Sequence, residues 1–162
     1  MADLTPLDEK LGEVLGLAQA AQAATKTVRE MEDAERFADD LDRMHDQAAE
    51  TERRTDDLVD GREGRKTAIR EKARDTRHEA TEMMETYLGG EEEALDGFEF
   101  LSMAEAGELC HWEIVQTMSR TAGEDDAHRL AEWAVGVQRE HVEAVRRAAL
   151  ALAAEEIGTA GR

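Results

Sequence analysis

Residues 118–130, MSRTAGEDDAHRL, hold the short connection that decides how this chain folds. On either side lie long stretches without proline, in which apolar residues recur every three or four positions, the spacing typical of bundle helices. The spacing predicts helices over 92–121 and 125–156, joined only by Ala122-Gly123-Glu124. Because such short connections join antiparallel neighbours, we expect these two helices to pack side by side in opposite directions.

The same periodicity predicts three further helices upstream, which cover 5–31, 34–59 and 65–88. Thr5 and Pro6 favour the start of the first, as a capping residue followed by proline at the first helical position. Glycine-containing breaks follow the second and third helices. We therefore expect one all-α domain over 1–162, with 158–162 as a frayed tail.

Composition limits the kinds of partner. The chain has 162 residues, with 39 acidic against 20 basic ones and a formal net charge of -19. Such a charge repels phosphates, so nucleic acid and anionic membranes are not expected as partners. The longest apolar run, 148–154, is far shorter than a bilayer span. A single cysteine and the absence of a recognisable leader at the N-terminus favour a cytoplasmic protein.

Basic residues concentrate in one segment, 62–77, which holds seven basic against three acidic side chains. One interpretation is that this segment clamps the third helix onto the acidic bundle or onto a second subunit. The other is contact with an anion or a nucleic acid. No aromatic residues that could stack on bases lie beside it, which favours the first interpretation.

The histidines point to a metal hypothesis. We place the apolar stripe of the fourth helix on Phe100, Met103, Gly107, Ile114 and Met118. His111 then faces the core, with Glu108 one turn before it, and His141 falls near the centre of the fifth helix's stripe. Two inward histidines on adjacent helices are what a metal site in a bundle needs. The alternative is a pair of buried histidines bonded to neighbouring carboxylates or to the backbone.

Residues 72–154 resemble a family of small bacterial stress-associated proteins, the ferritin-like family typified by YciF. The most specific match is His111-Trp-Glu113-Ile114, which is similar to that family's His-Tyr-Glu-Ile signature, and 130–141 resembles the last bundle helix. The resemblance implies a ferritin-like antiparallel four-helix bundle, with the helix at 65–88 in the long crossover connection. It also implies a dimer, and two iron or manganese ions held by inward carboxylates.

The sequence departs from the family's ligand pattern. The carboxylate of the second helix lines up with Gln47 or Ala48, and the nearest inward acid there is Glu52. Cys110, which we expect to be a buried inert thiol, replaces the glutamate before the signature histidine, and the fifth helix has Gln138 in place of glutamate. Since carboxylates neutralise a hard dinuclear pair, a normal site is expected to be broken.

Three function classes remain open. The first is a non-catalytic, self-associating bundle, stress-related by resemblance, which binds no cofactor and forms a homodimer through apolar residues of the third helix and through Trp112 and Trp133. The second is an iron, manganese or zinc protein that uses the reduced ligand set Glu52, Glu108, His111 and His141. The third is an acidic module that docks another protein.

Overall fold

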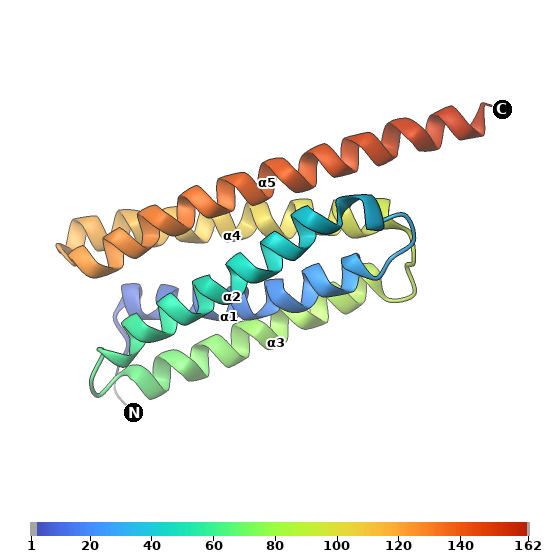
Figure 1. Ribbon diagram of the computed structural model, residues 1–162. Helices are drawn as coiled ribbons and strands as arrows, with labels where there is room; N and C mark the ends of the chain where they lie inside the picture. The colour runs from blue at the N-terminus through green and yellow to red at the C-terminus, as the bar shows by residue number, and fades with distance from the viewer. Residues whose placement is uncertain (1–2, 162) are drawn as a thin grey trace.

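The computed structural model describes residues 3–161, and over this range the chain is all-helical (Figure 1). The elements are α1 (Pro6–Arg29), a short 3-10 turn η1 (Glu35–Phe37), α2 (Ala38–Asp60), α3 (Lys66–Leu88), α4 (Ala94–Ala122) and α5 (Asp125–Ala160). The predicted all-α class is confirmed, and the five helices lie where the periodicity places them. Of the residues expected as a tail, 158–160 continue α5, and Arg162 lies outside the described residues.

Local sequence fixes the helix ends. Thr5 caps α1: its hydroxyl accepts from the Asp8 backbone N–H at 3.1 Å, and the Asp8 carboxylate accepts from the Thr5 N–H at 3.2 Å. This is the reciprocal capping box that a threonine followed by an acid favours. Gly123 ends α4 in the left-handed region at φ 69°, which glycine adopts without steric cost. The chain then reverses at once into α5.

The helices pack as neighbours along their lengths. α4 packs along α5, and α1 packs against α2, α3 and α4, while α2 also contacts α5. Figure 1 shows α3 and α5 on opposite sides of the molecule, with α1, α2 and α4 between them. Within residues 3–161, no helix combines the length and the apolar character needed to cross a lipid bilayer.

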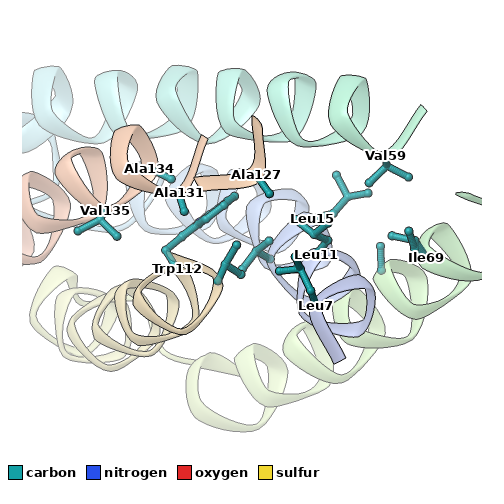
Figure 2. Packing of buried hydrophobic residues seen from close by; sticks show 13 residues of the cluster. Leu7, Leu11, Leu15, Val59, Ile69, Trp112, Ala127, Ala131, Ala134 and Val135 are labelled. Carbon is teal, nitrogen blue, oxygen red and sulfur yellow. The ribbon is translucent and has the colours of Figure 1, made fainter. Parts of the chain in front are cut away.

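Two apolar clusters form the core. The first gathers side chains from all five helices around Trp112, which is fully buried (Figure 2). The second lies at the other end of the molecule and includes Val28, Met44, Phe98 and Val145. Trp112 is therefore part of the core, and the expectation that it supplies surface for a dimer is wrong.

The basic segment forms ion pairs within the chain. Arg62 and Arg65 both pair with the fully buried Asp8 of α1, at 3.2 and 2.5 Å, and Arg62 also pairs with Glu124 between α4 and α5. Arg70 of α3 contacts Asp56 and Asp60 of α2. The segment thus links α3 to α2, and the connection between α2 and α3 to α1 and to the connection between α4 and α5. The interpretation as a clamp onto the acidic bundle is confirmed.

Two glycines allow α1 and α3 to approach closely. A Cβ atom at Gly12 would lie 2.8 Å from the backbone oxygen of Ile69, and one at Gly16 would collide with the backbone oxygen of Ala73. Backbone atoms of a packed helix cannot rotate away as a side chain can. The approach of α3 to α1 therefore depends on these two positions.

We expect Gly16→Ala to lower the free energy of unfolding by about 1–3 kcal/mol, because the added methyl group overpacks the α1–α3 contact. Gly107→Ala, in the middle of α4, is the matched control, since a Cβ there meets no atom within 4 Å. It should stabilise by roughly 0.5–1 kcal/mol through helix propensity. Denaturant midpoints measure both, and equal effects would contradict the close approach.

Candidate functional site

A layer of buried polar side chains separates the two apolar clusters. Glu105 and Glu108 come from α4, and Gln138 and His141 come from α5; each is at most 4% exposed. Each pair is spaced three residues apart, so its members lie on the same face of their helix. These four residues, with Gln47 of α2, are called the polar layer below.

Hydrogen bonds join three helices across this layer. The Gln138 side-chain amide donates to Glu105 Oε2 at 2.9 Å, and His141 Nδ1 lies 3.2 Å from the same oxygen. His141 Nε2 lies 2.7 Å from Oε1 of Gln47. The imidazole therefore bridges α2 and α4, and its ring orientation is fixed at both nitrogens.

Both partners of the His141 ring are oxygen acceptors. A neutral imidazole donates from one ring nitrogen and accepts at the other, so the tautomer of His141 sets which of the two contacts it donates to. The ring and the Glu105 carboxyl form a buried hydrogen-bonded pair, and Gln138 and Gln47 hold its two ends.

The second carboxyl of the layer is in a different state. Burial raises the pKa of Glu108 well above its usual value, and the negative charge of Glu105 raises it further. The Gln138 amide opposes this shift, but it also donates to Glu105. Burial therefore favours the protonated, neutral form of the Glu108 carboxyl.

His111 does not join the polar layer. It is half-buried, and its Nδ1 lies 2.8 Å from the backbone oxygen of Gly107 in its own helix. Its Nε2 faces Glu13 of α1 at 3.5 Å, and the same carboxylate pairs with Lys10 at 2.7 Å. His111 and His141 thus contact different partners and do not form the pair on facing helices that the sequence indicated.

Glu52 also lies apart from the layer. It is half-buried at the contact of α2 with α1, where Gln22 donates to its carboxylate and Gln19 lies 3.4 Å away. Of the four residues singled out from the sequence, only Glu108 and His141 belong to the polar layer. Glu105 was missed, although its spacing of three residues from Glu108 could have indicated a second acid on the same face.

The buried face of α4 differs from the predicted stripe. Leu101, Glu105, Glu108, Trp112 and Val115 are buried, whereas Met103 is 53% exposed. The buried face of α4 carries two acids and therefore fewer apolar residues than its neighbour. The apolar periodicity for this reason predicted that the neighbouring face is buried. Cys110 is exposed, and the expected buried thiol is wrong.

The donor set does not fit a dinuclear metal centre. Such a centre needs several inward carboxylates to neutralise two divalent ions, and here Glu105 is already bonded to Gln138 and His141. Among the described residues 3–161, no group of three or more histidine, cysteine, aspartate or glutamate side chains is placed to hold a metal ion.

Comparison with known proteins adds no assignment. No family model matches the chain, and no curated protein or solved structure matches it. The geometry of the polar layer is therefore what a functional argument must use.

We expect Glu108→Gln to stabilise the protein, and more at pH 8 than at pH 5. The unfolded carboxyl ionises near its usual pKa of 4.5, whereas the raised pKa keeps the folded one protonated. Stability is therefore lost as pH rises above about 4.5, up to the folded pKa. Glutamine removes this loss, and each gain of about 1 kcal/mol should raise the melting temperature by about 2–4 °C.

Melting curves across this pH range measure the effect. Glu99→Gln is the control, because Glu99 is exposed on the same helix. If both variants show the same pH profile as the unmodified protein, Glu108 is not a buried neutral acid.

Proposed function

We propose that this chain is a non-catalytic, self-associating protein with a ferritin-like bundle formed by α1, α2, α4 and α5. The contacts of α1 with α2, of α4 with α5, of α1 with α4 and of α2 with α5 support this arrangement. The position of α3, inside the connection from α2 to α4 and packed on α1, supports its role as a crossover helix. The stress-associated role and the cytoplasmic location rest on the sequence.

The observation that carries the non-catalytic proposal is the pairing of Glu105 with His141 and Gln138. In a dinuclear protein the positive charge facing the inward carboxylates comes from metal ions. Here an imidazole and an amide face Glu105, and burial favours the neutral form of Glu108. Protein groups thus take the bonding positions of the Glu105 carboxyl, and a hydrogen-bonded layer of this kind stabilises one packing of the helices.

Metal binding is the second candidate, and one observation favours it. Glu105, Glu108 and His141 lie in one buried layer, and carboxylate and imidazole are the ligands that iron, manganese and zinc accept. This set replaces the one taken from the sequence, since Glu52 and His111 lie elsewhere. Binding would require a metal to displace the proton of Glu108 and the bond of Glu105 to His141.

Elemental analysis separates the two candidates. We expect protein purified without added metal to hold far less than one iron, manganese or zinc per chain. Its melting temperature should not change with a chelator, because no metal contributes to folding. Glu105→Gln should leave the metal content unchanged. More than one iron or manganese per chain, or a fall of several degrees with chelator that one metal reverses, would contradict the proposal.

Self-association is supported by the end of α5. Leu150 and Ile157 are 56% and 77% exposed, and their spacing of seven residues puts them on one helix face. Figure 1 shows this end of α5 projecting beyond the other helices. Exposed apolar side chains on a projecting helix are typical of an interface. Among the apolar α3 residues expected to form the dimer interface, Met83 and Tyr87 are exposed, whereas Ile69 and Ala73 are buried.

We expect light scattering to give a homodimer of about 36 kDa, twice the 18.0 kDa of one chain. The double variant Leu150→Glu, Ile157→Glu should run as a monomer with an unchanged helical spectrum, because both positions are exposed within the chain. Gly136→Glu is the control for added charge on α5, at an exposed position about 21 Å along the helix from Leu150. A mass of 18.0 kDa for the unmodified protein at micromolar concentration would contradict self-association.

A further inference from the structure

A groove of about 460 Å³ runs between α3 and α4, with α1 as its floor. This volume falls within the range of about 300–1,000 Å³ that is typical of small-molecule sites. The floor is lined by small side chains, such as Ala20, Ala21 and Ala24. The groove exists because α3 packs on α1 and has few contacts with α4.

The groove is apolar at one end. Met83 and Tyr87 of α3 face Phe100 and Met103 of α4 there, and the rings of Tyr87 and Phe100 lie 6.1 Å apart. Met83, Tyr87 and Met103 are each more than half exposed, so this end is an open apolar surface. Aromatic and methionine side chains bind apolar chains of many shapes.

The middle of the groove is acidic. Glu105 and Glu108 of the polar layer line it from α4, and the exposed Glu79 lines it from α3. Beside these carboxyls, Gly107 has no side chain, and a Cβ atom there would meet nothing within 4 Å. Gly107 thus adds no side chain to the groove wall where Glu105 and Glu108 line it.

The two lysines of the groove lie at its other end and do not neutralise this region. Lys10 pairs with Glu13 at 2.7 Å, and Lys72 lies 3.7 Å from the same carboxylate. The groove therefore presents carboxyl groups in its middle and an apolar wall at one end. A ligand of matching chemistry carries a positive group joined to an apolar body.

We propose that this groove binds a small organic cation, a primary alkylammonium, with its ammonium group at the Glu108 carboxyl and its chain against Tyr87, Phe100 and Met103. Phe100 and Glu108 are eight residues apart on α4, which is about 12 Å of helix. An eight-carbon chain has a comparable length. The site lies outside the proposed assembly surface on α5. It rests on the proposed function in one respect: both require that no metal ion occupies the buried carboxyls.

Binding should release a proton. The neutral Glu108 carboxyl must ionise to pair with the ammonium group, so its proton passes to the buffer as the ion pair forms. The balance is one carboxyl proton released for each cation bound. An apolar contact at the groove's open end alone would release none.

The test titrates chelator-treated protein with octylammonium, octanol and octanoate by calorimetry in two buffers of different ionisation enthalpy. Octylammonium should bind about tenfold more tightly than octanol, because a charge-assisted hydrogen bond in a buried site has at least this effect. Octanoate should bind most weakly. Glu108→Gln should abolish the proton release while leaving octanol binding unchanged.

Gly107→Leu tests the location. The leucine adds a side chain to the groove wall beside the carboxyls and should weaken octylammonium binding at least about tenfold, since it excludes the ammonium group from them. Gly136→Leu is the matched control, because Gly136 is also exposed within a helix with open space at its Cβ and lies outside the groove. Equal binding to both variants, equal binding of octanoate, or no binding by metal-free protein would overturn the site. Metal found by elemental analysis would instead overturn the proposed function.

Discussion

The buried pair of Glu105 and His141 is the constraint on which the rest of the packing depends. It places a carboxyl and an imidazole in the interior between the apolar clusters, where an unpaired polar group is costly. The pair is satisfied only if α4 and α5 keep one register, and the bond from His141 to Gln47 extends that requirement to α2. A shift of one helix along another would break these directional bonds, whereas apolar contacts have no such directionality.

The sequence was sufficient to predict the helices, but not the rotation of α4 about its own axis, which decides which of its faces is buried. Regular spacing, Pro6 at the first turn and glycine at the breaks are local signals, so the helices lie where they were expected. The rotation of α4 depends on partners from other helices. The predicted stripe of Phe100, Met103 and Gly107 is in fact the wall of the open groove, because the buried neighbouring face carries the acids of the polar layer.

The candidate site could be predicted only in part, because some of its residues carry a local signal and others do not. His141 could be singled out because it interrupts the apolar stripe of α5, and Glu108 because it borders the predicted stripe of α4. Glu105 did not, since one more glutamate in a chain with 39 acidic residues carries no local signal of burial. The family resemblance identified Gln47 and Gln138 only as missing carboxylates. In the structure both are partners in the hydrogen-bonded layer, a role that only the neighbouring Glu105 and His141 reveal.

Gln138 explains how the layer is balanced without a metal ion. A glutamate at this position would be a third acid beside Glu105 and Glu108, and like charges so close in a dry interior require cations or extra protons. The amide of Gln138 donates to Glu105 instead, and the His141 ring lies 3.2 Å from the same oxygen. Burial favours the neutral form of Glu108, so the layer needs no further cation for it. Glu108 also lines the groove beside Gly107, and this is where the proposed ligand's ammonium group would exchange with the carboxyl proton.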